Sequence, residues 1–152
     1  MSMVNAQAQR SGDVDMGLVD LLNGLIAKAV VKLRDVYGES AGKIPIGALC
    51  DVLHDMQQEE EFANDLRDLD FRKIGGNSVS NALGDFLFLG GAWGSHTVPN
   101  PALSTISLGE DRAQKRLAKL EGRYGKAATR KLERLVDRFL EGLVSQGFLS
   151  EA

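Results

Sequence analysis

Apolar residues recur with helical spacing along most of this chain. Between Val14 and Val36 they follow the i, i+3, i+4 rhythm of an amphipathic helix, with Asp13 as the expected N-cap and Gly38 as the expected C-cap. Additional valines widen the apolar surface beyond one stripe. We therefore predict a long first helix that is either central in the fold or used for self-association. Gly24 inside it would allow another backbone to approach closely.

Two short extended segments are expected at distant points of the sequence. Pro45 stiffens the first, at 43–46, and the apolar positions that follow it fit a helix over 46–56. The second is a short strand at 104–108, after a stretch without helical rhythm. We predict no β structure beyond these two short segments.

The middle of the chain predicts two further helices. The acidic segment 59–70 keeps apolar residues at helical spacing, and Gly75–Gly76 then breaks the pattern. Asn77 or Ser78 is the expected N-cap of the next helix, and Gly90 is expected to stop it.

The C-terminal helical region changes phase near its middle. Apolar positions from Ala113 to Tyr124 lie on one side of a helical wheel, and those from Ala128 to Leu143 lie on another. The change falls beside Gly122 and Gly125, which indicates two helices or one kinked helix. The expected fold is therefore all-α, mainly helical: a compact multi-helix domain with a long Gly/Pro loop, a basic C-terminal helix or kinked helix pair, and at most a short β element.

We expect these elements to form one structural domain with four parts. Residues 1–12 form a disordered polar lead-in, and residues 13–90 an acidic helical body. Residues 91–109 form a Gly/Pro loop, and residues 110–152 a basic C-terminal helical arm that packs on the body. Loops as long as this one are usually functional or linking segments.

The net charge of −3 hides an uneven distribution. Residues 1–109 contain 8 basic and 14 acidic side chains, whereas residues 110–138 contain 10 basic and 5 acidic ones. The densest acidic stretch is 51–70, with eight acids and Arg67 as its one basic residue. Such a split predicts either a basic surface for an anionic partner or two parts that neutralise each other.

Basic residues repeat every three or four positions through the arm. On a continuous helix they would form one ridge about 33 Å long, at a rise of 1.5 Å per residue. The ridge could bind nucleic-acid phosphates. It could instead face solvent or dock on the acidic segment 51–70, and we rank these two alternatives first because charged helix faces usually face solvent. Its members are Arg112, Arg116, Lys119, Arg123, Lys126, Arg130 and Arg134.

The C-terminal sequence RKLERLVDRFLEGLVSQGFLSEA also matches, as a local pattern, the last helix and following strand of a winged-helix domain. A helix-turn-helix over 60–89 is disfavoured, because the segment 70–77 exceeds the usual turn of about three or four residues. The helix that would read DNA, SVSNALGDFLFL, also contains no Lys or Arg.

The stretch FLFLGGAWGSHTVPNP gathers rare residues, including Trp93 and His96. Trp93 between glycines is either an exposed anchor for a partner or a lid on the apolar helix ends, and burial of large aromatics favours the lid. His96 is expected to be a hydrogen-bonding group of the loop. We interpret this loop as the connector, and as the hinge if the arm moves.

Candidate catalytic groups are few. Cys50 and His54 are spaced i, i+4, but a zinc site would need two more ligands, and Cys50 lies on an apolar helix face. A thiol–imidazole pair of Cys50 with His96 has no supporting motif. The glycines and amides of KIGGNSVS lack the spacing of a phosphate-binding loop. We therefore expect no enzyme, no cofactor and no bound metal.

Composition places the chain among cytoplasmic proteins without a membrane segment. Its apolar runs are far shorter than the roughly 20 residues of a membrane span, its first residues contain no signal-peptide core, and its one cysteine fits a reducing compartment. The first hypothesis is a small non-enzymatic binding protein, an adaptor, regulator or inhibitor, that contacts a protein partner through helical surfaces. It includes self-association through the Val14–Val36 helix. The alternative is a nucleic-acid-binding, winged-helix-like regulator that uses the basic C-terminal helix.

Overall fold

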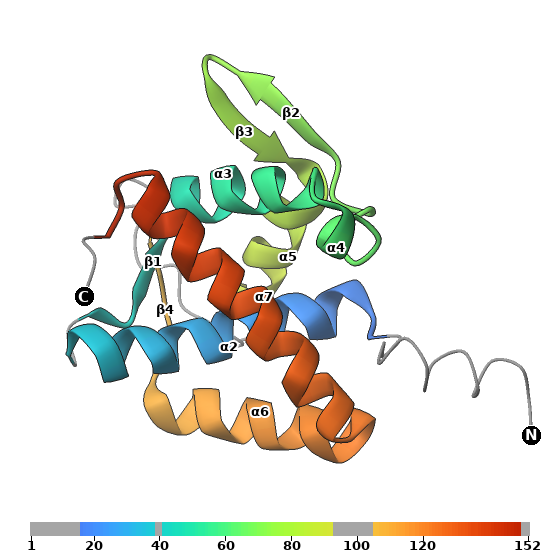
Figure 1. The fold of residues 1–152 in the computed structure, drawn as a ribbon, viewed down its shortest axis with the longest axis vertical. Helices are drawn as coiled ribbons and strands as arrows, with labels where there is room; N and C mark the ends of the chain where they lie inside the picture. Colours follow the sequence, from blue (N-terminus) through green and yellow to red (C-terminus); the bar gives the residue numbers. More distant parts are fainter. Residues whose placement is uncertain (1–15, 39–40, 93–104, 150–152) are drawn as a thin grey trace, which may run out of the picture.

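The computed structural model describes residues 16–38, 41–92 and 105–149. The fold is mainly helical, with two short two-stranded antiparallel sheets, as the apolar spacing predicts (Figure 1). The described elements, in chain order, are α2 (Leu18–Tyr37), β1 (Lys43–Pro45), α3 (Ile46–Gln57), α4 (Glu60–Ala63), β2 (Phe71–Ile74), β3 (Asn77–Ser80), α5 (Asn81–Ala92), β4 (Thr105–Ser107), α6 (Glu110–Tyr124) and α7 (Lys126–Ser145).

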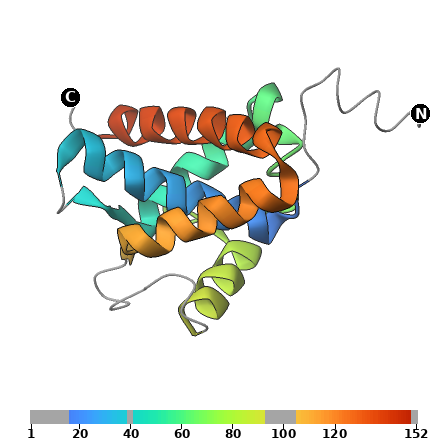
Figure 2. The same cartoon turned by 90° about the horizontal axis from the view of Figure 1, so that it is seen from below.

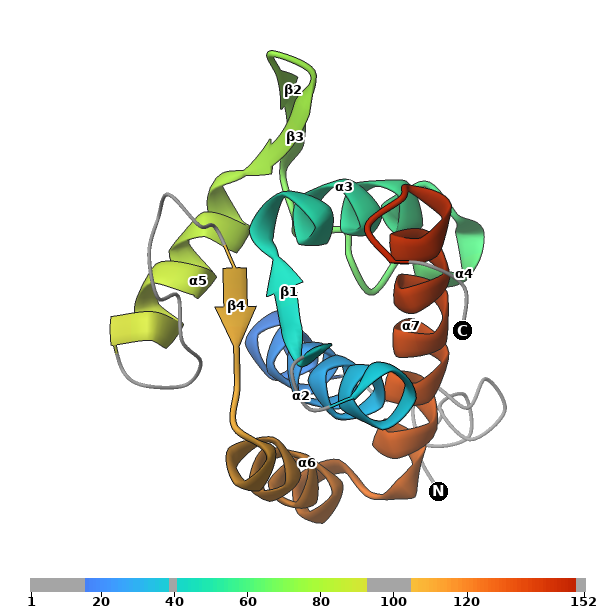
Figure 3. The ribbon, with the colours of Figure 1, turned by 90° about the vertical axis from the view of Figure 1, so that its left-hand side faces the viewer.

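Helix α2 is the central element of the fold. Helices α6 and α7 both pack against it (Figure 3). Its side chains Leu25, Ile26 and Leu33 are fully buried. The predicted central position of α2 is therefore observed, and packing in this position buries most of the apolar surface of the helix. Only Val19 and Val36, near its two ends, are large exposed hydrophobic residues of α2. Self-association through this helix stays a prediction.

The start of α2 differs from the expected one. The helix begins at Leu18, and Gly17 is its N-cap in an extended conformation, with φ −60° and ψ 155°. Asp13, the expected cap, lies outside the described residues. Gly24 is in close contact, as expected, but with side chains: a Cβ there would lie 2.7 Å from Leu132 Cδ1. A glycine at this position therefore lets α7 pack directly on α2.

Strands β1 and β4 confirm both predicted extended segments. They pair antiparallel, with Ile44 opposite Ile106, and both isoleucines are fully buried. The pairing joins two distant parts of the chain beside α2. Because β4 leads into α6 through Gly109, it also places the start of α6.

The hairpin formed by β2 and β3 is not among the predicted elements. Gly75 and Gly76 do not separate two helices; they form a two-residue turn with φ 57° and 85°, a conformation that side-chain-bearing residues rarely adopt. Helix α5 consequently begins later than expected and also ends later, because it continues through Gly90 to Ala92.

Ser80, rather than Asn77 or Ser78, caps α5. Its hydroxyl accepts a hydrogen bond from the Leu83 N–H at 3.2 Å, the usual N-cap geometry. Asp70 supports the cap, because its Oδ1 accepts from the Ser80 hydroxyl at 2.7 Å and from the Ala82 N–H at 3.0 Å. These bonds, led by that from Ala82, lower the pKa of Asp70 below its ordinary value of 3.8.

The acidic segment 59–70 is helical only at α4, and turns follow it to residue 68. Gln57 at the end of α3 explains part of this departure from the prediction. Its Nε2 donates to the carbonyls of Leu66 and Leu69, each at 2.7 Å, and so stabilises the turns at the end of this segment.

The predicted break in the C-terminal arm is present. Gly125, with φ 81°, separates α6 from α7, and the chain reverses there so that α7 runs back across α2 (Figure 2). The residues 146–149 after α7 form turns and bends rather than the strand of a winged-helix end. Of the helices in the described parts of the chain, none has the length and apolar character needed to cross a membrane.

Candidate functional site

The seven residues of the predicted basic ridge do not form one straight row. A ridge of about 33 Å requires a continuous helix, and the structure has two helices that meet at Gly125. The ridge is therefore divided between Arg112, Arg116, Lys119 and Arg123 on α6, and Lys126, Arg130 and Arg134 on α7.

Helix α7 is docked on the acidic segment 51–70 through ion pairs. The ammonium group of Lys131 lies 2.7 Å from Asp65 Oδ1, and its side chain is only 5% exposed. Arg134, a ridge residue, lies 3.7 Å from Glu61 at the surface. Part of the basic arm therefore neutralises part of the acidic body.

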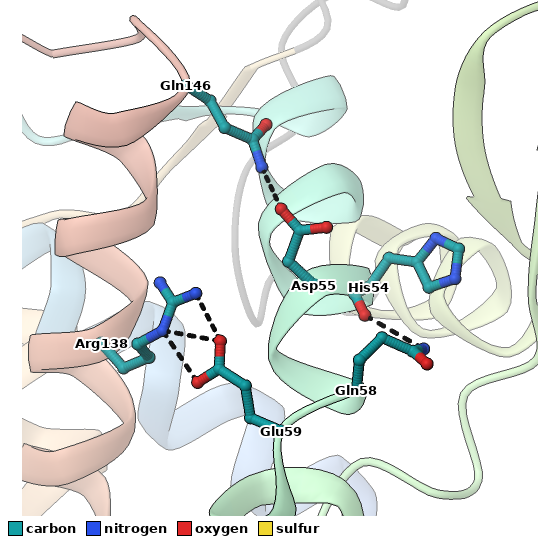
Figure 4. Close-up of polar contacts among 6 residues, drawn as sticks. All are labelled: His54, Asp55, Gln58, Glu59, Arg138 and Gln146. Carbon is teal, nitrogen blue, oxygen red and sulfur yellow. Dashed lines mark hydrogen bonds and ion pairs between the residues drawn. The ribbon is translucent and has the colours of Figure 1, made fainter.

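A second group of contacts holds the C-terminal half of α7 to α3 and α4. Figure 4 shows the Arg138 guanidinium and the Glu59 carboxylate facing each other; the Arg138 Nε donates at 2.9 and 3.0 Å, and Nη2 at 2.5 Å. Gln146 Nε2 donates to Asp55 Oδ2 at 2.6 Å. The bond to Glu59 raises the pKa of Arg138.

Sequence reasoning missed Lys131 and Arg138 as docking residues. They follow the same three-and-four spacing as the ridge, but they border the apolar face of α7, next to the buried residues Leu132 and Phe139. This position could have identified them from the sequence, because a basic residue at the edge of a buried apolar stripe lies close to the surface on which that stripe packs.

On α6, the basic residues Arg116, Lys119 and Arg123 lie beside α2. Arg123 Nη1 donates to Asp20 Oδ2 at 3.0 Å, and the Tyr124 hydroxyl donates to the same oxygen at 2.6 Å. The hydrogen bond with Asp20 raises the pKa of both groups. Asp20 thus fixes the end of α6 to the start of α2.

A pocket of about 270 Å³ lies between α2 and α6. Its cationic lining comes from Arg116, Lys119 and Arg123, and Asp20 and Asn23 line the α2 side. Burial, and then the like charge of Arg112, lowers the pKa of Arg116. An anion entering this pocket would therefore meet a positive potential that is only partly offset by Asp20.

The exposed cations extend beyond this pocket. Lys115 and Lys119 on α6, and Lys126 and Arg130 at the start of α7, are exposed, and none forms an ion pair with another residue in the described parts of the chain. We call the exposed basic side chains of α6, namely Arg112, Lys115, Lys119 and Arg123, the α6 cationic face.

A second pocket, of about 250 Å³, lies between α6 and α7. Its lining mixes apolar groups such as Leu117 and Leu132 with Lys28 and Glu121. Both pockets are smaller than the roughly 300–1,000 Å³ typical of sites for small-molecule ligands. They are large enough for single side chains of a macromolecular partner.

The two candidate catalytic residues among the described ones, Cys50 and His54, both lie on α3. His54 turns to the β2–β3 hairpin: its Nδ1 lies 2.9 Å from Ser78 Oγ, and its ring stacks on Phe71 with 4.9 Å between centroids. Burial, and then the neighbouring Asp51, raises the pKa of the half-buried Cys50 thiol. In the described ranges, no group of His, Cys, Asp and Glu is arranged to hold a metal ion.

The predicted loop anchor, Trp93 with His96, lies outside the described residues, and so does any pair of His96 with Cys50. Its roles as lid, anchor or hinge stay predictions. Searches of protein-family models, curated proteins and solved structures find no match for this chain.

Proposed function

We propose that this chain is a non-enzymatic binding protein that holds an acidic segment of a protein partner along the α6 cationic face. The observation that carries the proposal is the contrast between the two helices of the arm. Lys131, Arg134 and Arg138 of α7 are paired with the acidic segment 51–70. In contrast, Lys115 and Lys119 of α6 are exposed and form no ion pair with another described residue.

The docked α7 supports an acidic segment as the partner chemistry. Within this chain, a cationic helix face already accommodates carboxylates that project from a short helix and turns, at 2.5–3.7 Å. The α6 cationic face has the same residue types and spacing. A partner carboxylate entering the pocket between α2 and α6 would meet Arg116 and Lys119 together.

The size and lining of these two pockets suit a binding role. Volumes of about 250 and 270 Å³ suit side-chain anchors better than an enclosed substrate. The raised pKa of Cys50 also disfavours a thiolate nucleophile at neutral pH. We propose the role of an adaptor or regulator accordingly.

Nucleic acid is the second candidate partner. Arg112, Arg116, Lys119 and Arg123 succeed one another at one-turn intervals, and such a row can contact backbone phosphates. We rank it second because the row ends at Gly125, and because the contacts that basic residues of the arm make within this chain are to carboxylates.

The test is a titration of the full chain against labelled poly-glutamate and, separately, labelled duplex DNA, followed by fluorescence anisotropy. The test variant combines Lys115→Glu with Lys119→Glu, because neither side chain makes an ion pair with the described residues. The control variant combines Lys43→Glu with Arg67→Glu, which makes the same change in net charge at exposed positions elsewhere.

We expect poly-glutamate to bind, the test variant to weaken binding by about tenfold, and the control to change it by less than about twofold. Absence of binding, or equal losses in both variants, would contradict the proposal. Tighter binding of DNA, with steep salt dependence and the same sensitivity to the test variant, would replace it with the second candidate.

A further inference from the structure

The β2–β3 hairpin projects from the fold at the end opposite α6 (Figures 1 and 3). Its tip is exposed: Ile74, with 56% of its surface accessible, is one of four exposed large hydrophobic residues in the described parts of the chain. An isolated two-stranded hairpin is only marginally stable in water, so its base must be held by other contacts.

Helix α3 holds that base along β3. The Ser78 N–H donates to Asp51 Oδ1 at 3.1 Å, and the Ser78 hydroxyl meets His54 Nδ1 at 2.9 Å. The stacking of Phe71 on the His54 ring fixes the start of β2. The hairpin is therefore held in one position at its base while its tip stays uncovered by the described residues.

The bond from Ser78 to Asp51 identifies the free edge of the hairpin. In an antiparallel pair, opposite residues alternate between those that bond to each other and those whose N–H and C=O groups point outward. Since the Ser78 N–H points outward to α3, the N–H and C=O of its opposite residue, Lys73, point outward from the other edge. Phe71, two residues away, has the same orientation. Among the described strands, β2 pairs only with β3.

The free edge of β2 is cationic. Arg72 and Lys73 are exposed on it, and the sequence contains no carboxylate from Phe71 to Gly84. Arg72 donates to Asn81 Oδ1 at 3.1 Å and is partly balanced by Asp70, so Lys73 is the less compensated charge. Ile74 adds an apolar contact next to these charges. An incoming strand would therefore be favoured if it carried acidic side chains opposite the basic ones and an apolar side chain near Ile74.

From this placement we infer that β2 binds an extended acidic segment of a partner protein, which adds to the hairpin as a third strand. Backbone hydrogen bonds to Phe71 and Lys73 supply the affinity, and the basic side chains of Arg72 and Lys73 favour a strand that carries acidic side chains. This surface is independent of the α6 cationic face and lies at the other end of the molecule (Figure 1). A chain with both surfaces can bridge two partners.

A second copy of this chain fits the same edge poorly. Antiparallel pairing of β2 with another β2 would bring Arg72 and Lys73 of the two copies close together, and like charges across strands are unfavourable. The edge of β3 is occupied by α3 through Asp51. Basic residues on β2 thus oppose self-pairing and favour an acidic strand.

The first measurement is amide hydrogen exchange of the full chain by NMR. We expect the Lys73 amide to exchange fast and the Arg72 and Ile74 amides, which face β3, to be protected. Addition of a peptide of alternating glutamate and valine should slow exchange at Lys73 by tenfold or more. A Lys73 amide that is already protected in the free chain would overturn the assignment of the edge.

The second measurement is peptide affinity in two variants of the same residue. Lys73→Pro removes the outward N–H but no hydrogen bond within the hairpin, whereas Lys73→Thr removes the charge and keeps the N–H. We expect a loss of about tenfold for proline and of about threefold for threonine. A peptide of alternating lysine and valine should bind at least about tenfold more weakly than the glutamate peptide.

Equal affinities of the two Lys73 variants would overturn strand addition. Loss of peptide binding only in the Lys115→Glu, Lys119→Glu variant would assign the peptide to α6 and also overturn it. Self-association that Lys73→Pro abolishes would show a second copy as the occupant, and tighter binding of duplex DNA at this residue would show nucleic acid. Either result would contradict the inference and leave the test of α6 unaffected.

Discussion

Replacing Asp65 with asparagine should destabilise the fold, because it removes a carboxylate that is paired with a buried ammonium group. Lys131 Nζ lies 2.7 Å from Asp65 Oδ1, and the two side chains are 5% and 17% exposed. Breaking a buried ion pair on one side costs about 3–5 kcal/mol. Because Asp65 retains some access to water, we expect Asp65→Asn to lower the free energy of unfolding by about 2–3 kcal/mol.

The assay is urea unfolding followed by circular dichroism, with thermal unfolding as a second reading. The expected loss corresponds to a decrease in Tm of roughly 4–12 °C for a chain of this size. Lys131→Met removes the buried charge itself, so its cost should be lower, at about 1 kcal/mol, and the double variant should resemble it. The coupling free energy of the two changes should therefore be about 2–3 kcal/mol.

The matched control is Glu133→Gln. Glu133 pairs with Lys28 at 3.6 Å, but its side chain is 52% exposed, so the change should cost less than about 0.5 kcal/mol. If Asp65→Asn lowered the free energy of unfolding no more than Glu133→Gln, the reasoning that α7 is docked through a buried ion pair would be refuted.

Three further predictions follow from other parts of the fold. Gly24→Ala should lower the free energy of unfolding in urea by about 1–3 kcal/mol, because the added Cβ would lie 2.7 Å from Leu132 Cδ1. Gly122→Ala is the control: its Cβ would meet nothing within 4 Å, so it should raise the free energy of unfolding by about 0.5–1 kcal/mol. Folding lowers the pKa of Asp70, so its contribution to the free energy of unfolding is present above the ordinary pKa of 3.8 and is lost as the pH falls through the folded pKa. The difference in free energy of unfolding between the parent chain and Asp70→Asn should therefore shrink over that pH range. Cys50, whose pKa is raised above 9.0, should react slowly with a disulfide reagent at pH 7 in the folded chain and quickly in denaturant; fast reaction when folded would contradict the burial.

The helical elements could be predicted where local rules decide the structure. The apolar spacing of α2, the stiff segment at Pro45 and the phase change at Gly125 each depend on residues close together in sequence. The hairpin at Gly75–Gly76 had a turn signal, but its strands contain arginine, lysine, asparagine and serine, which rarely indicate β structure.

The candidate site depended more on distant contacts. The basic residues of the arm were visible in the sequence, but their division into docked and exposed sets was not. Lys131 meets a carboxylate 66 residues away, and only the packing of α7 on α2 decides which side chains reach the acidic segment. The chain also changes direction at Gly125, so the basic residues before and after it lie on two helices rather than on one straight ridge.

The most direct test of the central claim is an NMR titration of the isotope-labelled full chain with poly-glutamate. We predict amide shift changes centred on Lys115 and Lys119 of the α6 cationic face, with little change at Lys131 and Arg138, whose partners are within the chain. Changes centred on Lys131 and Arg138, or none on α6, would contradict the claim that α6 is the surface left for a partner.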